Sequence, residues 1–206
     1  MTSAGAEDCL EHTTLPNLLA DIRSCAHCAA HLPLGPRPIV QAAASARLLI
    51  IGQAPGARVH ETGVPWDDPS GQRLREWTGL ASEVFYDAPQ VALMPMGFCY
   101  PGKIAGAGDA PPRPECAPLW HGRLRAQLPD VRLTLLVGQY AHKAYLPKGA
   151  GSLIDAVRNF RAHAPALCPL PHPSWRVVGW MTRNPWFAAE LLPELRQSVR
   201  AALEEP

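Results

Sequence analysis

The sequence lacks an excess of either charge and contains no long apolar run. Its 206 residues include 19 Lys or Arg and 18 Asp or Glu, for a formal net charge of +1. This excludes a strongly basic domain that attracts nucleic acid by overall charge, so a nucleic-acid partner would have to contact a local patch. No stretch approaches the roughly 20 apolar residues of a membrane span, so we expect no membrane partner.

The first residues, MTSAGAEDCLEH, have neither the basic start nor the apolar core of a secretion signal, so we expect a cytoplasmic protein. We also expect a monomer. Internal repeats and low-complexity tracts are also missing. The length and a hydrophobic fraction of 47% favour one packed domain over residues 1–206, with 1–14 as a flexible or loosely packed segment. Proline, in contrast, is abundant at 23 residues and predicts extended connectors.

Apolar strand-like segments alternate with helical ones along the chain. The expected strands are 47–51, 91–100, 131–137 and a short one within 165–176 that leads into the His172 loop. The expected helices are 15–28, 70–77 with Ser70 as N-cap, one from 116, one after Gly138, and 185–203. This alternation predicts a three-layer α/β/α fold around a central, mostly parallel four-stranded sheet. Ligands of such sheets bind at the carboxyl ends of the strands, where Gly52–Gly56, Cys99-Tyr100 and His172-Pro173-Ser174 are expected to meet.

Four of the six cysteines form two spaced pairs. Cys25 and Cys28 are separated by two residues, and Cys99 and Cys116 by sixteen. Four thiolates suit either zinc or an iron–sulfur cluster, and the wide second spacing suits a cluster better than a zinc knuckle. Ordinary buried cysteines are the alternative. The other two, Cys9 and Cys168, stand outside the pattern and are interpreted as structural.

With these motifs together, the chain resembles the uracil-DNA glycosylase superfamily, and most closely a divergent bacterial subgroup of its iron–sulfur branch, family 4. The resemblance covers residues 15–203 and includes Gly52-Gln53-Ala54-Pro55-Gly56, Gly63, Pro65-Trp66, Ser70-Gly71, the four cysteines and His172-Pro173-Ser174. It implies a DNA base-excision glycosylase that removes uracil or another deaminated base from DNA. It also implies a [4Fe–4S] cluster on Cys25, Cys28, Cys99 and Cys116.

The departures from the family pattern fall at positions that handle the base and the water. Gln53 replaces the family's Glu, and Ala54 stands where the best-studied branches place a water-activating Asp or Asn. Pro95 replaces the Asn that reads the uracil edge, and Trp66 replaces the stacking Phe. These changes leave the choice of base open. They also support an alternative, a catalytically inactive iron–sulfur DNA-binding protein of the same fold.

Excision of a base needs a stacking face, a donor for the leaving anion and a positioned water. By resemblance His172 hydrogen-bonds the base and stabilises the anion, and Trp66 stacks on it, although Trp66 is equally compatible with a core role. We expect Ala54, Cys99 and Tyr100 to border the base as well. The candidates for positioning water are Gln53, His60, Glu61, Asp67 and Asp68. Asp67 and Asp68 have the alternative role of capping the next helix.

DNA contacts are expected around the same edge. Ser174 and the backbone of Pro55 and Gly56 are predicted to hold phosphates. Trp175 and Arg176 follow the His172 motif in the loop that, in relatives, wedges into the duplex. An apolar wedge there would offset part of the cost of unstacking a base.

Overall fold

The computed structural model describes residues 14–204 and contains the expected three-layer α/β/α fold. The central sheet consists of β1 (Leu48–Ile51), β2 (Val91–Leu93), β5 (Leu133–Val137) and β6 (Leu167–Leu170). Their order is β2-β1-β5-β6, and every pair in this sheet is parallel. Each strand is short and almost wholly apolar because helices cover both faces of the sheet.

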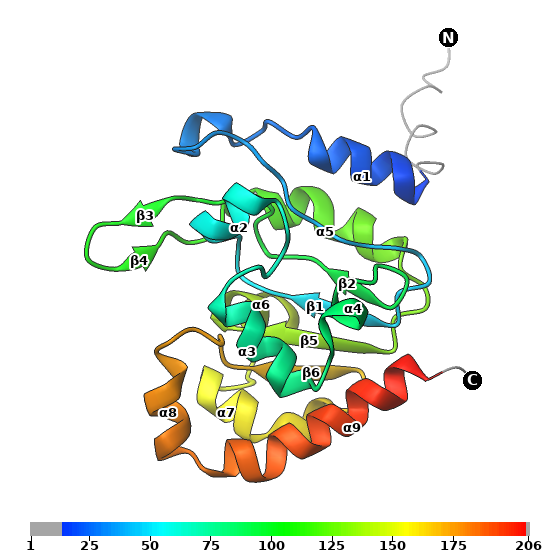
Figure 1. Cartoon of the computed structure of the whole chain (residues 1–206), viewed down its shortest axis with the longest axis vertical. Coiled ribbons are helices and arrows are strands. Elements are labelled where there is room, and N and C mark those ends of the chain that lie inside the picture. Colours follow the sequence, from blue (N-terminus) through cyan, green and yellow to red (C-terminus); the bar gives the residue numbers. More distant parts are fainter. Residues whose placement is uncertain (1–13, 205–206) are drawn as a thin grey trace.

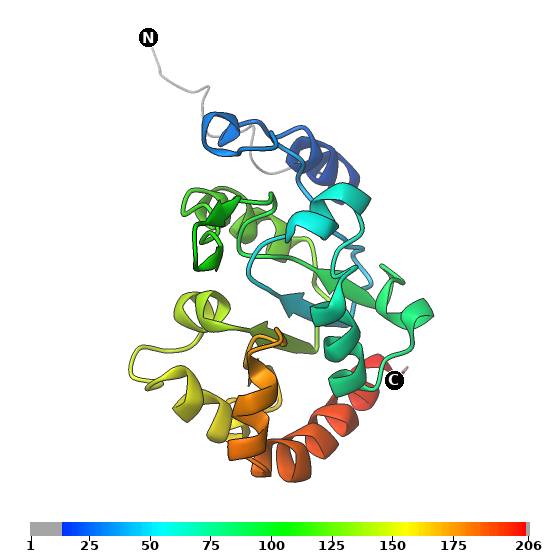
Figure 2. The same cartoon turned by 60° about the vertical axis from the view of Figure 1, so that its left-hand side comes forward.

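Alternate residues of the strands feed two separate cores. Leu48 and Ile50 of β1 pack in one core, whereas Leu49 and Ile51 pack in the other. The first core is closed by α3 (Pro69–Thr78), α7 (Leu153–Arg158), α8 (Val177–Arg183) and α9 (Leu192–Leu203). The second is closed by α1 (Leu15–Arg23), α5 (Cys116–Ala126) and α6 (Gln139–Tyr145). The helix α1 and the helix α9 therefore lie toward opposite ends of the molecule, with the sheet between them (Figure 1 and Figure 2).

Shorter elements connect these layers. They are α2 (Ala57–Thr62), α4 (Ser82–Phe85), the 3-10 helices η1 (Ala29–His31) and η2 (Phe160–His163), and the π-helix η3 (Phe187–Leu191). Two-residue strands β3 (Lys103–Ile104) and β4 (Gly108–Asp109) form an antiparallel hairpin that projects from the left side of Figure 1. Among the described residues, no helix is long and apolar enough to span a membrane.

Several predicted boundaries are corrected by the structure. The helix expected over 15–28 ends at Arg23, so the Cys25–Cys28 motif follows the helix and does not close it. The strand expected over 91–100 ends at Leu93, because the backbone then turns and Met96 and Gly97 donate hydrogen bonds to the turn that follows β1. The segment 101–118, expected to be only a loop, contains the β3–β4 hairpin.

The start of α3 also differs from the prediction. Asp68, not Ser70, is the N-cap: its Oδ1 accepts a hydrogen bond of 2.8 Å from the Gly71 backbone N–H. Pro69 occupies the first helical turn, where the absence of an N–H has little cost, so the cap lies one residue before the proline. Ser70 is thus inside the helix. The alternative weighed for Asp68, a helix cap, is confirmed.

Candidate functional site

A cavity of about 360 Å³ opens at the carboxyl edge of the sheet. Its size lies within the range of small-ligand pockets. Its walls come from the segment after β1, the start of α3, the segment after β2, the β3–β4 hairpin and the loop after β6. The lining includes Gln53, Ala54, Pro55, Gly56, Trp66, Asp68, Pro95, Asp109, His172, Ser174, Trp175 and Arg176. The structure thus brings together the Gly52–Gly56 turn and the His172 motif, as the sequence predicts.

The turn after β1 is fastened to the turn after β2. The Met96 N–H donates to the Gly52 carbonyl at 2.9 Å, and the Gly97 N–H donates to the Gln53 carbonyl at 3.0 Å. Gly52 also allows a close approach of the aromatic ring: a Cβ atom at this position would lie 2.5 Å from Trp66 Cζ2. The glycine is therefore required for Trp66 to lie over the end of β1.

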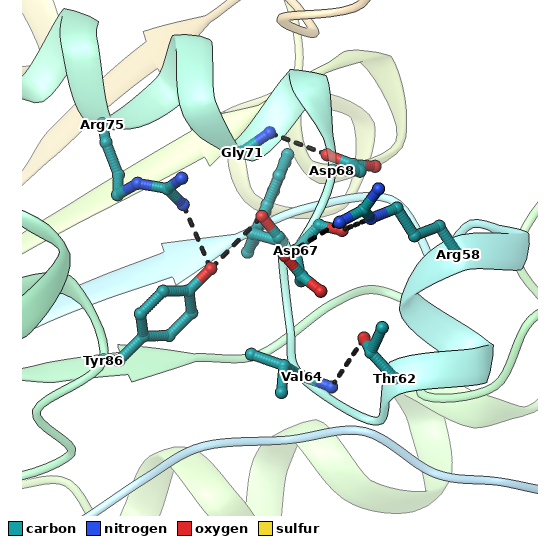
Figure 3. Close-up of polar contacts among 9 residues, drawn as sticks. Arg58, Thr62, Val64, Asp67, Asp68, Gly71, Arg75 and Tyr86 are labelled. Carbon is teal, nitrogen blue, oxygen red and sulfur yellow. Dashed lines mark hydrogen bonds and ion pairs between the residues drawn. The ribbon is translucent and has the colours of Figure 1, made fainter.

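Trp66 is in the left-handed backbone region, with φ of 58°, which is strained for a bulky residue. Its neighbours hold this conformation (Figure 3). The Tyr86 hydroxyl donates to the Trp66 carbonyl at 3.4 Å, and Arg75 donates to that hydroxyl at 3.0 Å. Arg58 Nε donates to the Asp67 carbonyl at 2.9 Å. This turn presents the indole to the cavity, which favours the stacking role for Trp66 over a purely core role.

His172 faces Trp66 across the cavity wall. The two rings are stacked, with centroids 5.9 Å apart and an interplanar angle of 30°. Behind the histidine, a Cβ atom at Gly138 would lie 3.3 Å from His172 Cβ, so the glycine before α6 leaves room for it. Desolvation lowers the pKa of His172, and Asp68 opposes that shift. The imidazole is therefore neutral near pH 7 and offers an N–H to a ligand without a full charge.

Two carboxylates converge near Gly56. A Cβ atom on Gly56 would lie 3.5 Å from Asp109 Oδ2 and 3.9 Å from Asp68 Oδ2. Asp68 uses its other oxygen to cap α3, so it serves both as a cap and as a cavity residue. Desolvation, and then the charge of Asp68, raise the pKa of Asp109, while Lys103 opposes the rise.

Sequence reasoning missed Asp109. It lies in the glycine- and proline-rich segment 101–118, and its local pattern, Gly-Asp-Ala-Pro, signals only a turn. Only the hairpin geometry, which the two-residue strands β3 and β4 define, directs it to the cavity.

The loop after β6 forms the mouth of the cavity. Arg73 Nη1 of α3 donates to the Pro173 carbonyl at 2.6 Å and so fixes the loop against the helix. Trp175 is 75% exposed, although it is a large apolar side chain, and the Arg176 guanidinium lies 5.2 Å from its ring centre. Arg176 also reaches the hairpin, since its Nη2 is 3.4 Å from the Ala107 carbonyl. These positions fit the predicted DNA-contact roles.

Three predicted site residues lie outside the lining of this cavity. Tyr100 is buried, and its ring centroid is 6.0 Å from that of His60 on α2. Cys99 lines a different cavity. For Cys99 and Tyr100 the cause is the early end of β2: the Phe98 carbonyl accepts a hydrogen bond from the Ile39 N–H at 2.8 Å, and Phe98 packs in the second core. The backbone that carries Cys99 and Tyr100 therefore turns away from the larger cavity. The expected base contacts of Cys99 and Tyr100 and the water contact of His60 stay predictions.

The four paired cysteines line one smaller cavity between the segment that follows α1 and the start of α5. The Phe98 N–H donates to Cys116 Sγ at 3.3 Å, and the Arg37 backbone and the Arg113 side chain act to lower the pKa of Cys99 and Cys28. Burial raises the pKa of Cys28 and Cys99, and that of Cys116 to about 12. Within residues 14–204, no group of three or more His, Cys, Asp or Glu side chains is arranged so that it could hold a metal ion.

The remaining cysteines divide between described and undescribed parts of the chain. Cys168 is buried within β6, in the first core, and burial raises its pKa to about 12. Its predicted structural role is confirmed. Cys9 lies outside the described residues.

A comparison with known protein families identifies the family to which the chain belongs. The family model of the uracil DNA glycosylase superfamily matches residues 40–196. The chain belongs to the uracil DNA glycosylase superfamily. The matched range contains Gly52–Gly56, Trp66, Asp109 and His172, and Ile39, one residue before it, also lines the larger cavity. The family acts on DNA, which suits the exposed Trp175 and Arg176 at the cavity mouth.

Proposed function

We propose that this superfamily member is a DNA glycosylase that hydrolyses the N-glycosidic bond of uracil or another deaminated base in DNA, as a cytoplasmic monomer. The observation that carries the proposal is the Trp66–His172 pair, 5.9 Å apart, in the wall of a cavity built by the family domain. An aromatic face beside a neutral N–H donor is what an extruded base needs. The exposed Trp175 beside the cavity supplies an apolar wedge that can fill the place of the extruded base in the DNA stack.

The chemistry follows from where charge develops. As the bond between C1′ and the base nitrogen breaks, its electron pair goes to the base, and the sugar becomes an oxocarbenium-like cation. A hydrogen bond from the His172 N–H to a base oxygen stabilises the anion, most effectively where water is partly excluded. The lowered pKa of His172 keeps the donor neutral, so it does not bind anions indiscriminately.

The family branch and the cofactor are part of the same proposal: a divergent iron–sulfur subgroup with a [4Fe–4S] cluster. Support comes from the donor set, since Cys25, Cys28, Cys99 and Cys116 line one cavity and the Phe98 N–H donates to the Cys116 sulfur. A cluster separates its ligands more widely than a single ion does, because each thiolate binds a different iron. When bound, the cluster would supply a structural link between the α1 segment and α5.

The glycosylase proposal is tested with a panel of single-lesion oligonucleotides. Purified protein is incubated with uracil-, hypoxanthine- and xanthine-containing DNA, and abasic sites are then cleaved with alkali. We expect strand cleavage for at least one lesion, and a loss of about 10²–10³-fold in rate for His172→Ala, because a preorganised donor to the anion is removed. His163→Ala, on η2 and away from the cavity lining, is the matched control with an unchanged rate. Absence of cleavage for all three lesions refutes the proposal.

One observation favours a second candidate, a DNA-binding protein without turnover. Ala54 and Pro95 both line the cavity, and neither side chain has a polar group to orient water or read a base edge. This candidate predicts tight binding to lesion DNA with no product, and the same affinity in His172→Ala. Turnover by the wild-type protein excludes it.

A further inference from the structure

We propose that Asp109 of the β3–β4 hairpin positions the attacking water and accepts its proton, the part that Ala54 cannot perform. The inference rests on the proposed glycosylase function. Its first support is position: Asp109 lines the same cavity as Trp66 and His172. Its Oδ2 would be 3.5 Å from a Cβ on Gly56, next to the turn that holds Ala54.

The carboxylate of Asp109 is also uncommitted. In the described part of the chain it makes no hydrogen bond or ion pair, whereas Asp68 uses Oδ1 to accept the Gly71 N–H at 2.8 Å. The residue lies at the open rim of the cavity and is exposed as a whole, so water can reach its partly desolvated carboxylate. A carboxylate with free lone pairs at the rim of a base pocket can hold a water near the sugar.

The hairpin that carries Asp109 is connected to the opposite side of the mouth. Arg176 Nη2 lies 3.4 Å from the Ala107 carbonyl, two residues before Asp109. The loop that contains His172 and the hairpin that contains Asp109 therefore border one opening. In the proposed arrangement the base lies against His172 and the sugar lies toward Asp109, so the water held by Asp109 is on the sugar side.

The step balances without a further reactant. The water oxygen forms a bond to C1′ while the C1′–N bond breaks, and the electron pair of that bond leaves with the base. The water proton passes to the Asp109 carboxylate, and the protonated acid then releases it to solvent or to the base anion. Because the transition state is dissociative, positioning accounts for much of the effect and a strong base is unnecessary.

The charged and titratable groups around Asp109 set its pH response. They are Lys103 of β3, Tyr100 before the hairpin, Asp68 at the start of α3 and Arg176 across the mouth. The pKa of Asp109 is raised above its ordinary value, mainly by desolvation. Since the ionised form is the active one, the excision rate falls as pH drops through this raised pKa.

The test is single-turnover excision from a uracil-containing oligonucleotide by wild-type protein, Asp109→Asn, Asp68→Asn and Asp130→Asn. Proton transfer by a positioned group contributes about 10²–10⁴-fold. We expect Asp109→Asn to lose at least 100-fold in rate, to bind the DNA with unchanged affinity, and to lose the acid limb that Asp109 contributes. We expect Asp68→Asn to lose less, because Asn also caps helices. Asp130, an exposed residue before β5 at the other edge of the sheet, is the control.

The outcomes separate this inference from the function on which it rests. Wild-type excision with an Asp109→Asn rate within threefold of it overturns the inference and leaves the glycosylase intact. Equal losses of affinity and rate, with no change in the pH profile, also overturn it, since they indicate a DNA contact only. Partial recovery in Asp109→Glu supports a carboxylate role. If the wild-type protein excises none of uracil, hypoxanthine and xanthine, the proposed function fails and this inference fails with it.

Discussion

Trp66 shows how single residues adapt this cavity to its task. Its backbone is left-handed, and side chains larger than glycine would clash with it at two neighbouring positions, Gly52 and Gly71. A Cβ on Gly71 would lie 1.8 Å from the Trp66 carbonyl oxygen, which is a backbone atom that cannot turn away. The strained residue is thus the one proposed to stack on the base, and strained backbone is common at functional sites.

Gly71→Ala therefore tests the turn. The added methyl group forces the Trp66 turn to move, and we expect a loss of about 1–3 kcal/mol in the free energy of unfolding, as for other overpacked positions. Excision slows at the same time because the indole is displaced. Urea denaturation and the single-turnover rate measure the two effects. Gly122→Ala is the matched control: a Cβ there meets nothing within 4 Å, so we expect a gain of about 0.5–1 kcal/mol inside α5. Equal stability of the two variants would contradict the account of Trp66.

A residue that follows a strongly patterned strand can be located from the sequence, whereas a residue whose position depends on the geometry of a turn cannot. His172 follows a buried strand, so its location at the strand end could be read from the sequence. Asp109 could not be read in this way, because a two-residue hairpin in a Gly/Pro-rich segment has no periodic pattern. Ser70 and Asp68 are both good N-cap types, and only Pro69, which favours the first helical position, distinguishes them.

At the scale of elements, the four parallel strands were predictable because runs such as Leu48–Ile51 are continuously apolar. The end of β2 was not predictable. The apolar residues after Leu93 continue the strand-like pattern, but they pack in a core while the backbone turns. Because of this difference, Cys99 lines the cavity of the four paired cysteines and Tyr100 is buried near His60 of α2.

The cysteine cavity carries the prediction at this scale. Protein purified without oxygen is expected to absorb near 400 nm and to contain about four iron and four sulfide per chain, as four-thiolate clusters do. Cys116→Ser removes a ligand and should lose this absorbance, whereas Cys168→Ser, within β6, should keep it. A colourless wild-type protein containing zinc or no metal would contradict the cluster.

The link between α1 and α5 should depend on the same ligands. The two helices are in contact. Cys25 and Cys28 lie in the segment that follows α1, and Cys116 is the first residue of α5. We therefore expect faster amide hydrogen exchange in α1 of Cys116→Ser than in α1 of the wild-type protein, with α9 unchanged as an internal reference.

For the whole molecule, buried histidines control the response to acid. His121 Nε2 lies 3.1 Å from the Pro95 carbonyl, which can only accept, so Nε2 carries the proton and Nδ1 accepts from the Tyr145 hydroxyl at 2.6 Å. Desolvation lowers the pKa of His121 to about 4 and also lowers that of His142 and His172. This network fixes Pro95 at the wall of the larger cavity.

The sign of the pH effect follows from proton counting. Below the ordinary histidine pKa of 6.5 the unfolded chain binds protons that the folded protein excludes, so stability falls as pH drops from 6.5 toward about 4. Between pH 7 and pH 5 we expect His121 alone to account for about 2 kcal/mol of the free energy of unfolding. Urea denaturation at the two pH values measures it. His121→Asn should show a flatter profile, and equal pH dependence in the two proteins would contradict the assignment.

Release of a base from DNA is the activity that the larger cavity is proposed to perform. The most direct measurement is mass spectrometric detection of free base after single-turnover incubation with a duplex containing one uracil, hypoxanthine or xanthine. The account predicts free base equimolar with abasic DNA for at least one of these lesions, at a rate that His172→Ala lowers by about 10²–10³-fold. Intact DNA and no free base for all three lesions would contradict it.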